Sequence, residues 1–356
     1  MRGRKATQAD YGVAKLIYNP DILKKKNNTI YMKKIYLIIC VLSTFMISAS
    51  QENKFPEAQI SNGIITAHFY LPDINNGYYR ATRFDWSGNT TSLEYKGHTY
   101  YGQWFSKYEP TIHDVVMGPV EEYGPVGYTE AKAGESFLKI GIGALLKPDD
   151  KPYNNFMLYK IQNPGKWKIR KKSDQIQFIH ILKDANYAYE YKKIIRLTEG
   201  KPEMVLEHII KNEGQRTIET SVYNHNFLMI DNEPTGPGYV VEFPFEVSGE
   251  GRGIGEIFRF EGNQIRFLRK PVKSESMYCG DVQGFSNNLK NYNIKIENIK
   301  TGAGVRIISD ESISKLVFWA SPTTVCPEPY TKVKIEPGQE YSWKIYYEYY
   351  TLNNPK

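Results

Sequence analysis

Tyr223-Asn224-His225-Asn226-Phe227-Leu228 ends a stretch in which apolar and polar residues alternate. Residues 217–223 alternate with period two, and residues 204–210 before them do the same. Asn212-Glu213-Gly214 lies between these runs and is typical of a turn, so the pattern predicts a β-hairpin. The second strand ends on an imidazole, which can gain or lose a proton near neutral pH. His225 is therefore the first candidate for acid–base catalysis, and a hydrogen-bonded structural histidine at a strand end is the alternative.

Similar alternation recurs along the chain beyond residue 51, where helix signals are nearly absent. Aromatic residues make up 14% of the sequence, with 28 tyrosines, which suits large half-buried sheets. No Ser- or Pro-rich linker and no repeat divides residues 51–356. We therefore expect a single domain there, an all-β fold built as one large antiparallel β-sandwich. The clearest predicted strands are residues 64–71, 91–95, 175–182, 187–197, 294–299, 305–308, 315–320 and 341–350.

The positive net charge of the chain comes from its N-terminus. Residues 1–34 hold nine Lys and Arg and two acidic residues, which leaves 37 charges of each sign in the remainder. A neutral remainder gives no indication of a polyanionic partner, so we predict no nucleic-acid binding.

The N-terminus has the pattern of a secretory signal peptide over residues 32–50. Met32-Lys33-Lys34 precedes the apolar run 35–47, and Ser48-Ala49-Ser50 supplies the small residues of a cleavage site. The apolar run is too short to remain as a membrane span. We predict a periplasmic or secreted protein without membrane association, whose mature chain begins at Gln51. Residues 1–31 are interpreted as a non-native extension upstream of the true start.

The reactive residue types disfavour nucleophilic, nucleotide-dependent and metal-dependent mechanisms. The six histidines are scattered, with no His-x-x-x-His and no Cys-x-x-Cys, and neither a phosphate-binding glycine loop nor a Gly-x-Ser-x-Gly elbow is present. We therefore expect no metal and no cofactor. Cys279 and Cys326 are the cysteines of the mature chain, and the sequence leaves open whether they form a disulfide.

A carboxylate near the C-terminus is the second candidate. Glu328 stands between Pro327 and Pro329, whose fixed φ angles stiffen the backbone. Burial among neighbouring aromatic residues would raise the pKa of this carboxyl toward that of a useful base. An exposed loop glutamate is the alternative.

A glycine-rich middle region, residues 112–143, interleaves charged and aromatic side chains, including His113, Tyr123 and Lys139. Loops of this kind on a rigid sheet commonly carry binding residues. The alternative is a long surface connection whose charges are simply solvated.

Together these segments resemble the aldose 1-epimerase (galactose mutarotase-like) superfamily. The similarity rests on Tyr223-Asn224-His225-Asn226-Phe227, on Cys326-Pro327-Glu328-Pro329 and on Pro337-Gly338-Gln339-Glu340-Tyr341. It implies a β-supersandwich over most of residues 55–350. It also implies that His225 is a general acid toward the sugar ring oxygen and that Glu328 is the general base on the anomeric hydroxyl.

The resemblance further implies a monosaccharide or oligosaccharide ligand. Arg83, in Ala81-Thr82-Arg83-Phe84-Asp85-Trp86, matches the family's sugar-binding arginine. The family's second histidine is absent, because the corresponding stretch is Val126-Gly127-Tyr128. Either Lys139 or His113 would then take over its role as a donor, or the enzyme activity would be altered or absent. Trp104, Tyr123 or Trp319 would stack on the sugar.

Three functions follow as hypotheses. The first is a mutarotase-like isomerase that interconverts sugar anomers, in which a sugar ring separates His225 and Glu328 by roughly 5–7 Å. The second is a non-catalytic carbohydrate-binding protein of the same fold. The third is a structural β-domain.

Overall fold

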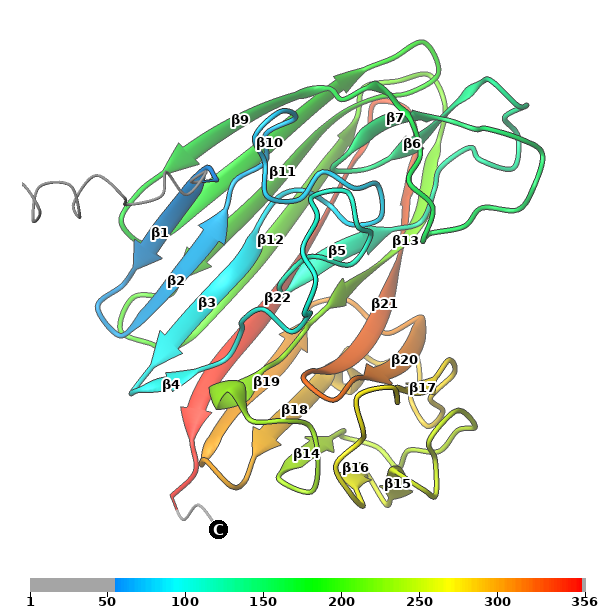
Figure 1. Ribbon diagram of the computed structural model, residues 1–356. Helices are drawn as coiled ribbons and strands as arrows, with labels where there is room; N and C mark the ends of the chain where they lie inside the picture. Colours follow the sequence, from blue (N-terminus) through cyan, green and yellow to red (C-terminus); the bar gives the residue numbers. More distant parts are fainter. Residues whose placement is uncertain (1–54, 354–356) are drawn as a thin grey trace, which may run out of the picture. The chain divides into compact units, whose positions relative to one another are not determined.

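Nearly all the regular structure in the computed structural model, which describes residues 55–353, consists of β-strands (Figure 1). The helices among these residues are two 3-10 turns, Ile230–Asn232 and Leu289–Asn291. None of the helices in this part of the chain has the length and apolar character needed to cross a membrane. The predicted N-terminal extension, signal peptide and cleavage site lie outside the described residues.

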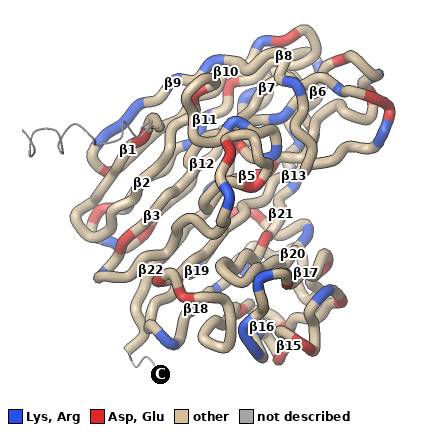
Figure 2. Tube along the Cα trace, in the orientation of Figure 1, with Lys and Arg blue, Asp and Glu red and all other residues tan. Residues whose placement is uncertain are grey.

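The largest sheet has ten strands in the order β15-β16-β14-β18-β19-β22-β12-β11-β10-β9, and Figure 1 shows it running from β9 at the top to β15 at the bottom. Its strands, in chain order, are β9 (Lys166–Lys171), β10 (Gln175–Lys183), β11 (Ala188–Leu197), β12 (Glu203–Asn212), β14 (Tyr239–Glu242), β15 (Phe258–Glu261), β16 (Gln264–Phe267), β18 (Asn293–Asn298), β19 (Ala303–Ser309) and β22 (Glu340–Thr351). The edge strand β9 reads Lys-Trp-Lys-Ile-Arg-Lys, and its positive charges follow the sheet edge in Figure 2. Charged side chains on an edge strand disfavour pairing with another chain.

A second sheet has five strands in the order β17-β20-β21-β13-β5. They are β17 (Met277–Cys279), β20 (Lys315–Ala320), β21 (Val325–Ile335), β13 (Ile218–His225) and β5 (Val120–Tyr123). Two smaller sheets complete the fold, with strands β1 (Glu57–Ser61), β2 (Ile65–Tyr70), β3 (Asn89–Tyr95) and β4 (His98–Thr99) in one and β6 (Ser136–Lys139), β7 (Gly143–Leu146) and β8 (Ile161–Asn163) in the other. All of these strand pairings are antiparallel, so the predicted all-β antiparallel architecture is confirmed.

The five-stranded sheet is covered on both faces. Leu316 and Phe318 of β20 point inward and join the main core with Tyr347 and other side chains of the ten-stranded sheet. On the opposite face, Val120 and Phe227 belong to a second apolar cluster, which the loop segments before β5 help to build. Side chains of a strand alternate between faces, so β5, β20 and β21 contribute to both the core and the outer cluster.

The eight clearest predicted runs fall on β2, β3, β10, β11, β18, β19, β20 and β22. The predicted hairpin between residues 204–210 and 217–223 is wrong. β12 pairs with β11 and β22, whereas β13 pairs with β21 and β5 in the other sheet. The Asn212 side chain stabilises this crossover by donating to the carbonyls of Arg216 (2.8 Å) and Ile335 (2.9 Å).

Both Cys279 and Cys326 are buried free thiols. Cys279 points into the main core and Cys326 into the outer cluster, on opposite faces of the five-stranded sheet. Strand β20 also separates the two, so no disulfide forms between them.

Candidate functional site

Strand register brings the candidate residues together on the outer face of the five-stranded sheet. Tyr223 pairs with Tyr330, and the same register returns at the bridge between Leu228 and Val325. That register sets His225 of β13 directly opposite Glu328 of β21. Side chains opposite each other on one face of an antiparallel pair have Cβ atoms about 4.5–5.5 Å apart, so these two groups meet across the strands.

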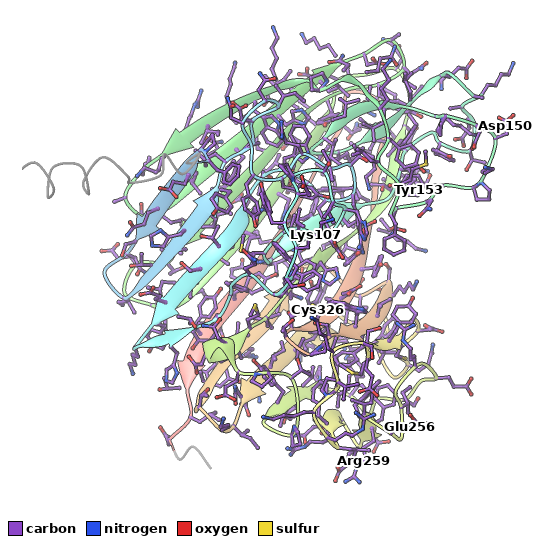
Figure 3. The ribbon with its side chains drawn as sticks, viewed as in Figure 1. Lys107, Asp150, Tyr153, Glu256, Arg259 and Cys326 are labelled. Carbon is purple, nitrogen blue, oxygen red and sulfur yellow. The ribbon has the colours of Figure 1, made fainter. Side chains whose placement is uncertain are left out.

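The ladder between β13 and β21 is interrupted where the catalytic candidates lie. Pro327 and Pro329 have no backbone N–H to donate, and regular pairing stops at Tyr223 and resumes at Leu228. The Asn226 side chain bridges the gap, because its Nδ2 donates to the Pro327 carbonyl at 2.7 Å. Glu328 thus lies inside a strand and is buried, so the alternative of an exposed loop glutamate is wrong; Cys326, labelled in Figure 3, marks the strand two residues earlier.

His225 and Glu328 form a buried pair with 3.3 Å between Nε2 and Oε1. The expected separation of roughly 5–7 Å applies to the two groups with a sugar ring between them; as direct cross-strand neighbours they lie closer. Phe227 stacks on the imidazole with ring centroids 3.7 Å apart, and the rings of Phe84 and Trp319 meet it edge-on at 5.7 Å and 5.3 Å. The aromatic enclosure removes water from the pair.

Burial determines the protonation of this pair. It lowers the pKa of His225 well below 6.5, and the positive charge of Arg83 acts in the same direction. Burial also raises the pKa of Glu328 from 4.5 to about 8, although Arg83 opposes this shift. Between these limits the pair holds a single proton in a water-poor site, and the 3.3 Å separation allows either group to carry it.

Arg83 is held beside the pair by Glu122 and Tyr223. Its Nε donates to Glu122 at 2.7 Å, its Nη2 donates to the Tyr223 hydroxyl at 3.2 Å, and that hydroxyl donates to Glu122 at 2.6 Å. The guanidinium also lies over the rings of Phe84 and Phe156, 4.5 Å and 5.0 Å from their centroids. Although burial opposes ionisation, Arg83 and Lys139 hold the pKa of Glu122 below its ordinary value, so Glu122 is ionised. The positive charge of Arg83 is thus paired with a carboxylate, and its guanidinium is a fixed hydrogen-bond donor.

A pocket of about 450 Å³ lies over this face of the sheet. The strands contribute Tyr223, His225, Tyr278, Val317, Trp319, Glu328 and Tyr330, and Phe227 follows shortly after β13. Loops contribute Arg83, Trp104, Asp114, Asn155, Phe156 and Arg252. The pocket therefore combines aromatic surfaces with a few fixed polar groups, as sites for polar small molecules do.

Five of the residues predicted from the sequence line this one pocket: His225, Glu328, Arg83, Trp104 and Trp319. The others lie elsewhere.

Lys139 is fully buried, donates to the Tyr123 carbonyl and lies 5.5 Å from the Tyr153 ring centroid. Burial lowers its pKa to about 8, with Glu122 opposing. Tyr123 itself points into the main core beside Tyr191 and Trp343. Neither residue lines the pocket. For Tyr123 the reason is the alternation along β5, which turns its side chain away from the face that carries Glu122.

His113 is half-buried next to the pocket, with its Nε2 3.5 Å from Asp114 and its ring edge-on to Phe156 at 4.9 Å. It does not line the pocket, although both of these neighbours do. The segment without the second histidine, Val126-Gly127-Tyr128, also lies outside the lining, and Tyr128 is buried with its hydroxyl on the Lys151 carbonyl.

Three further site residues, Glu122, Tyr223 and Tyr330, were not predicted from the sequence. Period-two spacing carried the missing signal: Tyr223 lies two residues from His225, and Tyr330 lies two residues from Glu328. Phe156 and Asn155 come from a loop whose approach to the site no local pattern indicates.

Among residues 55–353, no group of three or more His, Cys, Asp and Glu side chains is arranged to hold a metal ion. No model of a known protein family matches the chain, and no curated protein matches its sequence.

The fold does match solved structures. An aldose epimerase homologue from C. elegans superposes with a TM-score of 0.52 at 13% identity, covering 84% of this chain and 99% of that one. A putative aldose 1-epimerase from Escherichia coli K12 gives a TM-score of 0.50 at 11% identity, covering 83% and 99%. Another from Klebsiella pneumoniae gives 0.50 at 12% identity, covering 80% and 76%. The chain thus has the galactose mutarotase-like fold, which confirms the resemblance at the level of fold.

Proposed function

We propose that this protein is an aldose 1-epimerase-like isomerase that interconverts the anomers of a sugar without a cofactor. The observation that carries the proposal is the buried His225–Glu328 pair, 3.3 Å apart on one face of a pocket lined by aromatic residues and Arg83. The opposite pKa shifts leave the pair with one proton near neutral pH, which rests on Glu328, and the 3.3 Å separation lets that proton pass to His225.

The single proton of the pair is sufficient for a complete turnover. Once that proton has passed from Glu328 to His225 across the 3.3 Å between them, the Glu328 carboxylate takes the proton of the anomeric hydroxyl while the imidazolium protonates the ring oxygen. The bond between C1 and the ring oxygen breaks, its electron pair stays on that oxygen, and an open-chain aldehyde results. After rotation about C1–C2, Glu328 returns its proton to the carbonyl oxygen and His225 recovers the other as the ring closes, so both groups end as they began.

The other lining residues have roles in binding. Arg83, fixed by Glu122, would donate to sugar hydroxyls from the side of the pocket. Trp319 and Trp104, whose ring centroids lie 5.5 Å apart, offer apolar surface to the C–H faces of a sugar.

The test is polarimetric mutarotation over a panel of free sugars, with Glu328→Gln and His225→Asn as variants. Each variant should lower the catalysed rate by roughly 100-fold or more while sugar binding weakens little, since each removes proton transfer and keeps shape. The double variant should lose less than the product of the two, because the groups act as a unit.

Non-catalytic carbohydrate binding is the second candidate, favoured by the absence of the family's second histidine at Val126-Gly127-Tyr128. If the wild type binds sugar but shows no mutarotation that Glu328→Gln or His225→Asn abolishes, the binding function replaces the enzyme.

The signal-peptide pattern supports a periplasmic or secreted location. N-terminal sequencing of exported protein should find Gln51 as the first residue. Exported protein that still carries residues 1–31 would contradict the predicted signal peptide and its cleavage site.

A further inference from the structure

Two aromatic side chains at the rim of the pocket are exposed. The accessible fraction of Tyr278 is 42% and that of Phe156 is 58%, whereas Phe227 and Tyr223 deeper in the pocket are buried. A binding site for one small sugar ring has no use for aromatic surface outside the place where the ring is held. An exposed aromatic ring continuous with the pocket is therefore a candidate for contact with a larger ligand.

The position of Tyr278 relative to the acid–base pair follows from register. Tyr278 of β17 pairs with Trp319 of β20, and Trp319 pairs with Cys326 of β21, two residues from Glu328. Neighbouring strands are about 4.8 Å apart, so β17 lies roughly 10 Å from β21 along the sheet. The outer face thus presents a row of rings that leads from the catalytic pair to the sheet edge.

Polar groups accompany this row. Arg252 exchanges backbone hydrogen bonds with Tyr278, donating at 2.8 Å and accepting at 3.1 Å. Its Nε donates to the Ser276 carbonyl at 2.9 Å, which orients the guanidinium at the pocket wall. An aromatic face next to fixed guanidinium donors suits a pyranose ring, which has an apolar C–H face and a rim of hydroxyls. An apolar peptide or a lipid chain would make no use of these donors.

The size of the pocket agrees with a ligand larger than one ring. Its volume of about 450 Å³ lies within the roughly 300–1,000 Å³ of sites that bind drug-sized molecules.

We propose that the substrate is an oligosaccharide whose reducing-end ring lies over His225 and Glu328 and whose next ring stacks on Tyr278 beside Arg252. This inference rests on the proposed function, since it takes the reducing end to be the reacting ring. Tyr278 is then a specificity-determining residue, and it has no part in proton transfer.

The experiment compares each of four monosaccharides, glucose, galactose, mannose and xylose, with its own β-1,4-linked disaccharide and trisaccharide. Isothermal titration gives the Kd and polarimetry gives kcat/KM for the wild type, Tyr278→Ala and Tyr278→Phe. Leu289→Ala is the matched control, because Leu289 is an exposed apolar side chain outside the pocket lining.

The wild type should bind at least one disaccharide more tightly than its monosaccharide. Tyr278→Ala should reduce that ratio by roughly fivefold or more, the usual minimum for removing an aromatic anchor. Tyr278→Phe keeps the ring and should keep the ratio, as should Leu289→Ala. A ratio that is lost in Tyr278→Phe as well, or kept in Tyr278→Ala, would contradict the stacking role.

The outcomes also separate this inference from the proposed function. Mutarotation of a monosaccharide with no gain for its disaccharide overturns the oligosaccharide inference and leaves the isomerase in place. A disaccharide preference that depends on Tyr278 but comes without mutarotation supports the inference and overturns the isomerase. Absence of binding to every sugar of the panel overturns both.

Discussion

Two groups with opposed pKa shifts face each other across β13 and β21, and the shifts have one main cause. Burial disfavours the charged form of each group, so His225 loses its proton more readily and Glu328 retains its proton longer than in water. The pair therefore holds one proton over a broad range of pH. At the level of single residues, the chemistry therefore depends on the aromatic enclosure as much as on the two catalytic candidates.

The pH dependence of kcat/KM should reflect this. Above pH 8 the pair loses its proton because the pKa of Glu328 is about 8, so no acid remains and activity should fall. On the acid side the pair gains a second proton, and the base is lost only well below pH 6.5, since burial lowers the pKa of His225. Polarimetry across this range should give a plateau that ends near pH 8. An alkaline limb that starts near pH 6 would contradict it.

The same carboxyl should reduce stability at neutral pH. The folded pKa of Glu328, about 8, lies above its ordinary value of 4.5, so its contribution to stability is present below pH 4.5 and is lost as pH rises toward 8. Glu328→Gln has no proton to lose. Its advantage over the wild type in free energy of unfolding should therefore grow between pH 5 and pH 8, by at most about 1.4 kcal/mol for each unit of the pKa shift. Its melting temperature should rise relative to the wild type over the same range.

Calorimetry of both proteins at the two pH values is the measurement. A stability difference that does not change with pH would show that Glu328 titrates normally in the folded protein.

At the scale of elements, the interrupted ladder between β13 and β21 is the feature that positions the pair. Asn226 closes it, with its Nδ2 on the Pro327 carbonyl and its Oδ1 accepting from the Tyr347 hydroxyl at 2.9 Å. Tyr347 belongs to β22, so this one amide ties both strands of the site to the ten-stranded sheet.

Asn226→Ala should destabilise the fold by about 2–4 kcal/mol, because it leaves two buried polar groups without their partner. Tyr347→Phe is the control: it removes one of the two hydrogen bonds without leaving a buried hydroxyl, and should cost about 1 kcal/mol. Urea denaturation monitored by tryptophan fluorescence gives both values. Equal effects of the two substitutions would mean that the bond to Pro327 contributes little.

Sequence patterns located the strands well but not their partners. Alternation identified residues 315–320 and 341–350 because each strand has one face in the core. Nothing local in Asn212-Glu213-Gly214 distinguishes a hairpin turn from a crossover between sheets, so the pairing of β12 with β13 was wrong. Because register is a property of strand pairs, the direct contact of His225 with Glu328 could not be predicted either. Lys139 and Tyr123 were placed in the site for the same reason, since the sequence does not say which face of a short strand meets the pocket.

At the scale of the whole described domain, a buried ion pair joins the two large sheets. Glu121 of β5 forms an ion pair with Lys193 of β11 and a 2.7 Å hydrogen bond with His208 of β12, and all three side chains are buried. Asn224 also donates to Glu121, at 2.9 Å. Glu121 and Asn224 are the chain neighbours of Glu122 and His225, so the pair lies directly behind the site, on the inner face of the same two strands.

Charge in this network is balanced. Although burial opposes it, Lys193 and His208 lower the pKa of Glu121 to about 2, so the carboxylate stays ionised. Burial lowers the pKa of His208 despite the attraction of Glu121, so the imidazole is neutral and its Nε2 donates to the carboxylate. Lys193 and Glu121 are thus a pair of opposite buried charges, which also interact with the buried carboxyl of Asp85, whose pKa burial raises to about 7. Because the two charges belong to different sheets, either alone would oppose the packing of the sandwich.

Lys193→Met should therefore destabilise the protein by about 3–5 kcal/mol, the usual cost of leaving one buried charge without its partner. Adding Glu121→Gln removes that charge and keeps an acceptor for Asn224 and His208, so the double variant should recover most of the loss. Lys300→Met is the matched control, since Lys300 pairs with Glu233 at 2.7 Å on the surface and should contribute no more than about 1 kcal/mol. Urea denaturation of the three variants and the wild type measures these differences. A double variant no more stable than Lys193→Met would mean that Lys193 stabilises the sheets through its methylene chain and not through its charge.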